Sequence, residues 1–405
     1  MIQKLIPILG ITFVDIIGFS MMLPVLPYLV LHFGLSAIVV GILLSTFSFC
    51  QLVSGPIWGN VSDRIGRKRV LIISQIGATI GWAMLAFAPT ILWVFIARIV
   101  EGVSGGNIGV TQAYVADLVD GKDRARAFGL ISATFAAGMA FGPVGGGLLY
   151  QYYHHNFAAP FLAASALQLL TLVLTIVLLP ESRSKQEEEQ AHVGTREIAA
   201  TFASPRFRPL LLQKFALSLC LYGWYSVIAL YLAGQLHFGL VETANYFSAF
   251  AIVNVLINGF GVGKASNALG DRVMSILGLA LLVVGLACTP FVHNSLGFVG
   301  VMVLFALGSA YANNGITAMI SNAATERDQG TVLGVSSSLD SLSGIIAPPI
   351  STGLLAGYGS SFAGIESLVW AVVGLIVGIR NMLNATPVLA KVEEEETIVE
   401  VEATT

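Results

Sequence analysis

Charged residues are scarce in this chain. They make up 11% of its 405 residues, less than half of the roughly 25% found in soluble domains, whereas hydrophobic residues make up 56%. A soluble chain of this length and composition could not cover its surface with polar groups. The apolar residues also fall in long runs: residues 71–89, 157–179 and 276–292 approach or reach the roughly 20 needed to cross a bilayer. The composition therefore excludes a soluble protein and predicts an integral membrane protein.

Cysteine is also rare, and catalytic motifs are missing. Cys50, Cys220 and Cys288 lie far apart inside apolar segments, which is typical of small core residues and not of a disulfide or metal site. The sequence contains no Walker phosphate loop and no HExxH zinc motif, and its polar connections are too short for an active site. We therefore expect no enzyme, no ATP-driven pump, no cofactor or metal, and no nucleic-acid partner.

Apolar runs between turn signals predict twelve membrane-spanning helices. They are expected at residues 5–31, 38–60, 70–88, 91–116, 126–150, 157–179, 210–236, 243–265, 273–292, 296–320, 331–356 and 362–384. Nineteen of the twenty Lys and Arg residues then lie near the chain ends or in even-numbered connections, with Lys214 in the central one. Because cytoplasmic loops collect basic residues, both termini are predicted to be cytoplasmic, in a multi-pass protein of the inner (plasma) membrane. The remaining basic residue, Arg98, falls inside span four.

The two halves of the chain resemble each other. Gly59 to Gly66 follows span two as Gly263 to Gly270 follows span eight, and residues 129–143 match 334–348, at nearly the same offset of 204 to 205. Parallel halves of this kind place a binding site at their interface near mid-membrane. We therefore predict an all-α membrane protein of twelve transmembrane helices in two pseudo-symmetric six-helix bundles. The expected units are bundles at 1–180 and 209–384, a cytoplasmic linker at 181–208, and an acidic, disordered tail at 385–405.

The connection between spans two and three carries a charged motif, Gly59-Asn-Val-Ser-Asp63-Arg64-Ile-Gly66-Arg67-Lys-Arg-Val. Its two glycines allow a tight loop, in which Asp63 can pair with the basic cluster. Asp117, at the same end of span four, can join them, so that the network would hold one conformation and release in another. The alternative is a plain basic anchor on the cytoplasmic side.

This loop resembles the signature motif of the major facilitator superfamily. Residues 138–147 (GMAFGPVGGG) resemble the antiporter motif of its drug exporters, and residues 98–102 (RIVEG) resemble its Arg-x-x-x-Gly motif. Residues 113–129, 159–161 and 179–182 are similar to the matching stretches of tetracycline-efflux proteins. The resemblance implies the twelve-helix fold of that superfamily and the proton-driven export of a drug or metabolite.

The same resemblance assigns roles to single residues. It implies a cytoplasmic latch made of Gly59, Asp63, Arg64, Gly66, Arg67 and Asp117. It also implies an antiporter motif made of Gly138, Gly142, Pro143 and Gly146, in which the bend at Gly142 and Pro143 lets spans of the two halves slide close. Tetracycline exporters carry an acid in span three, whereas this span has none. The cargo therefore need not be tetracycline.

Four ionisable residues at mid-membrane depth are candidates for proton coupling, because each costs at least about 2.5 kcal/mol there and marks a pathway or relay. Asp15 in span one is interpreted as a proton carrier or substrate contact, with a structural acid as the alternative. Arg98 and Glu101 share a face of span four, where they neutralise each other or Arg98 tunes the proton affinity of a neighbouring carboxyl. Asp340 in span eleven is a second proton or cation site, or a structural acid among hydroxyls. Glu366 is expected at the outer interface of span twelve.

Uncharged polar residues mark the expected cavity. An amide that faces lipid would be unsatisfied, so these side chains should point into the bundle. The candidates are Gln51, Asn107, Gln112, Tyr225, Asn254, Asn258 and Asn313. They suit a largely apolar ligand that forms a few hydrogen bonds. The alternative is hydrogen bonding between helices.

The leading hypothesis is a proton-coupled antiporter that exports amphipathic small molecules or drugs by alternating access and works as a monomer. Its partners would be a small-molecule substrate, protons and the lipid bilayer. A second hypothesis is the transport, including uptake, of one metabolite such as a sugar, a siderophore or an amino-acid derivative. A third is a membrane receptor or chaperone on the same fold that transports nothing.

Overall fold

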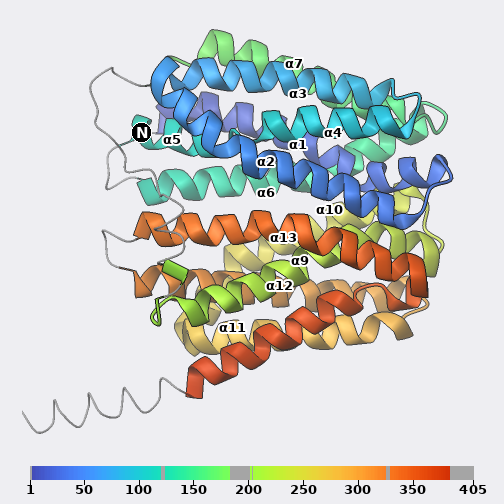
Figure 1. The fold of residues 1–405 in the computed structure, drawn as a ribbon, viewed down its shortest axis with the longest axis vertical. Helices are drawn as coiled ribbons and strands as arrows, with labels where there is room; N and C mark the ends of the chain where they lie inside the picture. The colour runs from blue at the N-terminus through green and yellow to red at the C-terminus, as the bar shows by residue number, and fades with distance from the viewer. Residues whose placement is uncertain (1, 120–123, 183–200, 203, 325–328, 384–405) are drawn as a thin grey trace, which may run out of the picture.

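The regular secondary structure of the computed structural model is entirely helical in the residues that it describes, which are 2–119, 124–182, 201–202, 204–324 and 329–383 (Figure 1). The N-terminal half contains α1 (Ile2–His32), α2 (Ala37–Ile65), α3 (Arg67–Ala86), α4 (Ile91–Gly105), α5 (Ile108–Leu118), α6 (Arg124–Tyr152) and α7 (Ala158–Leu178). The C-terminal half contains α9 (Arg208–Gln235), α10 (Leu240–Leu256), η2 (Ile257–Gly261), α11 (Val262–Cys288), η3 (Thr289–Phe291), α12 (Ser295–Ala323), α13 (Gln329–Tyr358) and η4 (Ser360–Phe362), followed by a helix at 365–383. The predicted tail and most of the predicted linker lie outside the described residues.

Eleven helical stretches among the described residues are long and apolar enough to cross a membrane. One of them, Leu240–Phe291, has 52 residues. At 1.5 Å per residue it would be about 78 Å long, more than twice the ~30 Å hydrocarbon core. Its backbone leaves the helical conformation at Gly270 (φ 76°, ψ 155°), so this stretch supplies two crossings. The expected twelve-helix, all-α membrane fold is thereby confirmed.

The helices form two bundles that lie side by side in Figure 1, the N-terminal one above and the C-terminal one below. Inside the upper bundle α1 packs against α6 and α7, and α3 packs against α7. Inside the lower bundle α11 packs against α12, and α9 packs against α13. Contacts between the bundles run mainly from α2 to α13 and from α6 to α10. These four helices therefore form the boundary at which a site between the halves has to lie.

The predicted repeat has a counterpart in the backbone. Gly66 between α2 and α3 has φ 103° and ψ 150°, close to the angles of Gly270 in the second half. Only glycine adopts this region readily, because a Cβ would meet its own backbone there. Pro143 inside α6 and Pro348 inside α13 also occupy matching positions. The two halves thus turn at equivalent glycines and carry a proline at equivalent positions of α6 and α13.

Span four differs from the single helix that was expected at 91–116. Helix α4 ends at Gly105, and α5 begins at Ile108 after a break at Gly106 and Asn107. Glycine is a poor helix former, and a Cβ on Gly106 would lie 2.8 Å from the backbone nitrogen of Gly55 in α2. Close packing against α2 therefore requires glycine at a position where glycine also weakens the helix.

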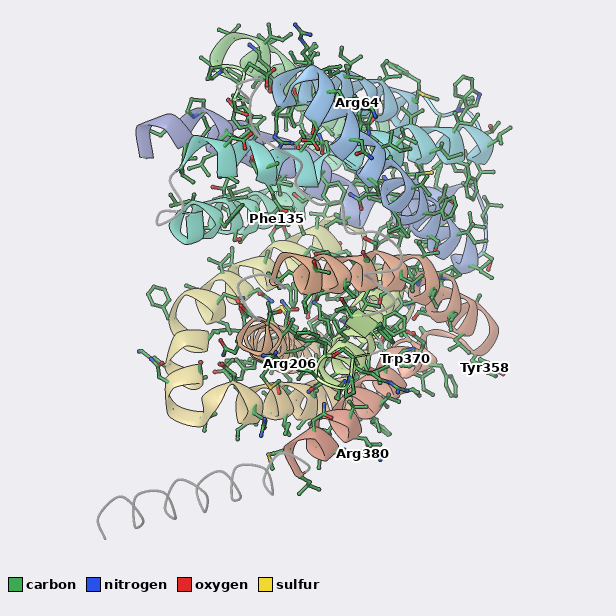
Figure 2. All side chains as sticks on the ribbon, turned by 60° about the vertical axis from the view of Figure 1, so that its left-hand side comes forward. Arg64, Phe135, Arg206, Tyr358, Trp370 and Arg380 are labelled. Carbon is green, nitrogen blue, oxygen red and sulfur yellow. The ribbon has the colours of Figure 1, made fainter. Side chains whose placement is uncertain are left out.

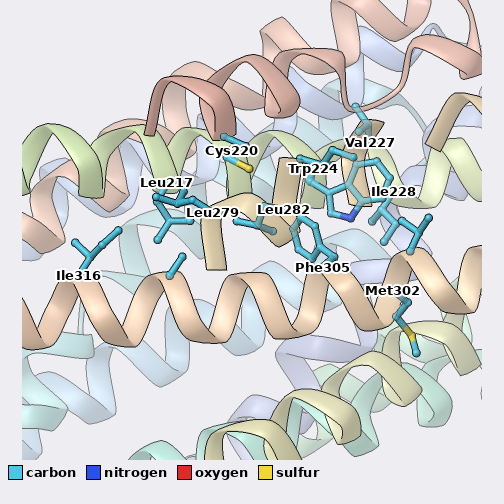
Figure 3. Packing of buried hydrophobic residues seen from close by; sticks show 14 of the residues in the cluster. Leu217, Cys220, Trp224, Val227, Ile228, Leu279, Leu282, Met302, Phe305 and Ile316 are labelled. Carbon is cyan, nitrogen blue, oxygen red and sulfur yellow. The ribbon is translucent and has the colours of Figure 1, made fainter. Parts of the chain in front are cut away.

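Helix α9 lies in the centre of the C-terminal bundle. Its side chains Leu217, Trp224 and Ile228 pack against Leu282 of α11 and Phe305 of α12 (Figure 3). Large apolar side chains on other helices, by contrast, lie on the outer surface, among them Phe141, Val177, Phe260, Leu296 and Ile376. Lipid is the apolar solvent that such a surface requires. The central position of α9 means that a polar side chain on this helix faces protein or a cavity and not lipid.

Candidate functional site: a cavity between the two bundles

A cavity of about 1190 Å³ lies between the two bundles. Phe135 of α6, which Figure 2 labels where the bundles face each other, is part of its wall. All four expected coupling residues line it, namely Asp15, Arg98, Glu101 and Asp340. So do the expected polar residues Gln51, Asn107, Tyr225, Asn254, Asn258 and Asn313. The expectation for Gln112 was wrong: it lies on the exposed side of α5, outside the lining.

The bundles are joined at one end of the cavity, which we call the far end because it lies opposite Ile2 and Leu383, the first and last described residues. There the Tyr28 hydroxyl donates to the carbonyl of Phe238 (2.8 Å), and the Ser45 hydroxyl donates to the carbonyl of Ile345 (2.6 Å). The Val144 amide also donates to the Ser248 hydroxyl (3.1 Å). Toward the other end, the lining continues through residues such as Asn258 in η2. The cavity is thus sealed at the far end by hydrogen bonds between the halves.

Asp15 lies in the middle of α1, on the cavity wall. Its carboxyl is hydrogen-bonded to the side chain of Gln168 on α7, which is itself buried. Gln168 was not among the residues expected from the sequence, and a lone amide in an apolar span is the signal that could have found it. The partner of this carboxyl is therefore a neutral amide.

Arg98 and Glu101 form an ion pair within α4 and are almost fully buried, with 1% and 4% of their surfaces exposed. The Arg98 guanidinium also lies 3.0 Å from the sulfur of Met22 and over the ring of Phe47, 4.3 Å from its centroid. Arg98 Nε and Glu101 Oε1 have no hydrogen-bond partner among the described residues. A buried polar atom without a partner costs about 1–3 kcal/mol. The uncompensated cost and the position at the cavity wall make this pair a candidate functional site.

A second ion pair lies in the C-terminal half, and the sequence interpretation missed it. Lys214, expected in the cytoplasmic connection, is instead buried near the start of α9, with 7% of its surface exposed. Its ammonium lies 3.2 Å from Asp340 Oδ1 and donates to Asn313 Oδ1 at 2.9 Å. Lys214 was assigned to the central connection because of its charge, although the span expected at 210–236 already contained it; α9 begins at Arg208, so Lys214 lies inside the helix.

Glu366 was expected at the outer interface, and that expectation was also wrong. Its side chain is buried, with 6% of the residue's surface exposed, and it accepts a hydrogen bond from the Ser351 hydroxyl at 2.5 Å. Gly364 (φ 83°) packs against the Trp224 ring, which brings the start of the last helix into the bundle. Space for the carboxyl comes from Gly223 of α9, where a Cβ would collide with it. Glu366 lies outside the cavity lining.

The charged motif expected as a loop lies instead on the last turns of α2 and the first turn of α3, with only Gly66 between the helices, and its polar side chains gather around Arg67. Its guanidinium pairs with Asp63 (3.1 Å) and Asp117 (3.0 Å) and donates to the Ser62 hydroxyl (3.0 Å). Arg64, by contrast, is exposed on the surface (Figure 2), and a Cβ on Gly59 would meet nothing within 4 Å. The structure therefore brings together three of the residues expected in the latch, Asp63, Arg67 and Asp117.

Two further residues join this cluster from the segment after α7. The Lys68 amide donates to Glu181 Oε1 (3.2 Å), and the Ser182 hydroxyl donates to Asp117 Oδ2 (3.1 Å). A Cβ on Gly66 would lie 2.5 Å from the Glu181 carboxylate, so glycine is required there for space as well as for its positive φ. The sequence interpretation did not include Glu181 and Ser182 in the latch, although both lie in a stretch whose family resemblance it had noted.

The glycines of the expected antiporter motif pack differently from what the resemblance implied. A Cβ on Gly138, Gly142 or Gly146 would collide with α1 of the same bundle and not with the other half. The contact with the other half is made by Gly147, where a Cβ would lie 2.8 Å from Ala244 of α10. Pro143 lies on the cavity wall. Gly138, Gly142 and Gly146 therefore pack α6 against α1, whereas Val144 and Gly147 of the same motif contact α10 of the second bundle.

Asparagine side chains are joined by hydrogen bonds along the cavity wall. Asn258 donates to Asn254 Oδ1 (2.7 Å), and Asn314 of α12 donates to Asn258 Oδ1 (2.8 Å). Asn258 lies in η2, one turn of π-helix, a feature that occurs often at functional sites. The amides bond to one another, as the alternative interpretation expected, and they also line the cavity.

Two six-helix bundles around a central, partly polar cavity that is sealed at one end define a secondary transporter. The model of the Major Facilitator Superfamily matches residues 8–348 and again 246–401. The chain belongs to this superfamily. It is thus a multi-pass membrane transporter of small molecules and not an enzyme, and the resemblance seen in its motifs is confirmed.

Relatives and solved structures agree with this family. The chain is 34% identical over 382 residues to the tetracycline resistance protein, class C, of Escherichia coli, which covers 92% of this chain and 95% of that protein. It is 28% identical to multidrug resistance protein 2 of Bacillus subtilis (strain 168), over 84% of this chain and 85% of that protein. The fold matches a bacterial homolog of the human lysosomal transporter Spinster (TM-score 0.78, 16% identity, 93% of this chain and 95% of that one). It also matches the nucleoside transporter NupG (TM-score 0.76, 14% identity, 95% and 99%).

Proposed function

We propose that this protein is a proton-coupled antiporter that exports amphipathic small molecules or drugs by alternating access. Export of drugs is supported by relatives named for resistance to tetracycline and to multiple drugs. The observation that carries proton coupling is the position of Asp15, a carboxyl on the cavity wall whose hydrogen-bond partner is the neutral amide of Gln168. A carboxyl beside a neutral group in an apolar setting can bind and release a proton without breaking an ion pair.

The described conformation fits one step of such a cycle. If both termini are cytoplasmic, in the inner (plasma) membrane, the sealed far end faces outward and the cavity accepts cargo from the cytoplasm. Proton binding and cargo release then belong to the opposite conformation, in which the hydrogen bonds of Tyr28, Ser45 and Val144 at the far end are broken. We assign the cluster around Arg67 the role of a latch between these two states. One chain contains both bundles and a complete cavity, which supports function as a monomer.

Arg98 and Glu101 complete the proposed coupling site. Their ion pair is part of the cavity wall, is almost fully buried, and retains one unpartnered polar atom on each side chain. A change in the charge of Glu101 would leave Arg98 unpaired in a low-dielectric setting, which is costly. We therefore assign the pair a role in linking proton occupancy to the position of α4.

The proposal is tested in proteoliposomes that carry an imposed pH gradient. Addition of a rhodamine dye or of tetracycline should dissipate the gradient as protons exchange for cargo. Asp15→Asn should abolish this exchange, because an amide cannot carry the proton, while cargo binding remains measurable. The matched control is Asp271→Asn, which alters an acid on α11 that is hydrogen-bonded to Ser266 outside the cavity.

Three results would contradict parts of this proposal. Normal exchange by the Asp15→Asn variant would remove Asp15 from the coupling site. Cargo movement that leaves the pH gradient intact would exclude proton coupling. Accumulation of cargo in the direction of proton flow would make the protein an uptake system, as the metabolite hypothesis expects.

A further inference from the structure

Four polar side chains meet on the wall of the cavity's C-terminal half. Lys214 and Ser218 come from α9, Asn313 from α12 and Asp340 from α13. The Lys214 ammonium lies 2.9 Å from Asn313 Oδ1 and 3.2 Å from Asp340 Oδ1, and the Ser218 hydroxyl donates to the same Oδ1 atom. Lys214, Asn313 and Asp340 line the cavity. Side chains from three helices thus hold one ion pair at the position where cargo has to lie.

The ion pair has unused hydrogen-bonding capacity. An ammonium group has three donors, and two of those of Lys214 are directed at Asn313 and Asp340. The contacts of Asp340 within the described residues use Oδ1, which leaves Oδ2 as a further acceptor. The Asp340 side chain is 34% exposed, whereas that of Lys214 is 8% exposed. A ligand can therefore meet both a donor and an acceptor at this pair without displacing either residue.

The N-terminal ion pair of the cavity does not offer the same access. The Arg98 and Glu101 side chains are only 1% and 3% exposed, and the guanidinium is covered by Met22 and Phe47. Among the charged pairs that line the cavity in the described residues, the one formed by Lys214 and Asp340 is the more accessible. Recognition of a charged head group is therefore expected in the C-terminal half.

The charge balance of the pair decides which head group fits. Lys214 and Asp340 together carry no net charge, so a ligand with one charge would leave a net charge in a setting of low dielectric constant, which is costly. A ligand with adjacent opposite charges keeps the site neutral and finds a partner for each charge. Its apolar body can then lie against the aromatic wall, where Tyr225 meets Phe250 edge to face with ring centroids 6.2 Å apart.

We propose that Lys214 and Asp340 form the head-group subsite of the cavity and select a zwitterionic amphipathic cargo. Asp340 Oδ2 accepts a hydrogen bond from the cationic group of the cargo, and the third N–H of Lys214 donates to its carboxylate or enolate oxygen. Asn313 and Ser218 are positioning residues that hold the two charged groups in place. This inference rests on the proposed export of small molecules and names the chemical class of the cargo.

The test uses three dyes that share a xanthene frame and differ in charge: a rhodamine with a free carboxylate (zwitterion), its methyl ester (cation) and fluorescein (anion). Binding to the purified full-length protein in detergent is measured by fluorescence polarisation, without any ion gradient. The wild type should bind the zwitterion about ten-fold more tightly than the ester, as expected for one charge-assisted hydrogen bond. Lys214→Met should abolish or reverse this preference, because it weakens zwitterion binding and leaves the Asp340 carboxylate free to pair with the cationic ester.

Two further variants keep the test decisive. Because Lys214→Met leaves Asp340 without its partner and can impair folding, the double variant Lys214→Met/Asp340→Leu removes both charges; it should fold and bind all three dyes with similar affinity. Lys264→Met, which alters an exposed lysine on α11, is the matched control and should retain the wild-type preference.

The proposal is overturned if the wild type binds ester and zwitterion equally, if fluorescein binds most tightly, or if Lys214→Met keeps the preference. Failure of proton coupling in the Asp15→Asn experiment would leave these binding results unchanged, so the two proposals fail independently.

Discussion

Lys214 illustrates how a single residue can escape interpretation from sequence. It lies near the basic central connection, where lysine is expected to contact water or lipid head groups. The structure instead places it inside the bundle, paired with Asp340 and Asn313. The role of Lys214 therefore follows from its partners on other helices, which local sequence does not show. One of them, Asp340, was already identified from its position in an apolar span.

The close packing of Gly142 on α6 leads to a prediction at the scale of a single residue. A Cβ on Gly142 would lie 2.5 Å from the carbonyl of Ile17 and 3.0 Å from Ser20 Cβ, and the backbone of α1 cannot yield easily. Gly142→Ala should therefore destabilise the protein by about 1–3 kcal/mol, as overpacking does. The measurement is the midpoint of thermal unfolding in detergent, followed by intrinsic fluorescence.

Gly129 on the same helix is the matched control. A Cβ there meets nothing within 4 Å, so Gly129→Ala should leave the midpoint unchanged or raise it slightly. Equal destabilisation by both substitutions would mean that helix α6 does not depend on close approach to α1.

At the scale of the helices, most boundaries followed from local sequence. The apolar runs and their charged flanks predicted the crossings because each transmembrane helix must satisfy its own backbone within one segment. The break between α4 and α5 was missed, since Gly106 and Asn107 lie in an apolar run that reads as continuous. Packing of Gly106 against α2, which is not visible from α4 alone, accounts for the glycine at that break.

The turn at Gly270 leads to a prediction about how the two crossings are connected. Its backbone angles (φ 76°, ψ 155°) are accessible almost only to glycine, and they separate the two crossings within residues 240–291. Gly270→Ala should destabilise the fold by about 1–3 kcal/mol through backbone strain. Thermal unfolding of the purified variant measures this loss.

Gly263 on the same stretch has helical geometry, and a Cβ there meets nothing within 4 Å. Gly263→Ala is therefore expected to behave like the wild type. If Gly270→Ala is equally stable, the chain turns at this point without needing a positive φ.

At the scale of the whole molecule, the two bundles meet at the far end and enclose a cavity between them. The contact combines hydrogen bonds, among them those of Tyr28, Ser45 and Val144, with packing of α2 against α13 and of α6 against α10. An interface between two parallel halves of this kind opens and closes as the bundles rock against each other. The geometry is therefore suited to alternating access.

A disulfide across the far end tests this interpretation. In a background without Cys50, Cys220 and Cys288, the pair Val144→Cys and Ser248→Cys should cross-link on mild oxidation, because the Val144 nitrogen and the Ser248 hydroxyl are 3.1 Å apart. The cross-link should abolish transport in proteoliposomes by holding the far end closed, and reduction should restore it. Mobility on non-reducing gels measures the cross-link.

The control is the single variant Val144→Cys in the same background, which has no second thiol in the chain to pair with. Its mobility and its transport should not change under the same conditions. Transport that persists in the cross-linked far-end variant would show that the far end need not open.

The sequence by itself determined that the protein lies in a membrane, how many times the chain crosses it, that its two halves are related, and to which family it belongs. These properties depend on local quantities: the length of apolar runs, the placement of Lys and Arg, and short motifs with fixed spacing. It also identified the residues that line the cavity where a charge or amide stands alone in an apolar span, as with Asp15, Glu101 and Asn258.

Only the tertiary structure decided which polar groups meet. It joined Lys214 to Asp340, Gln168 to Asp15 and Glu181 to the loop at Gly66, moved Glu366 inside, and turned Gln112 away from the cavity. These contacts could not be predicted because the helices are surrounded by lipid and not by water. In a water-soluble protein the apolar face of a helix marks the buried side, whereas in a membrane protein both the lipid-facing and the inward-facing sides are apolar. The rotation of each helix about its axis is therefore set by packing against its neighbours, which no single segment reveals.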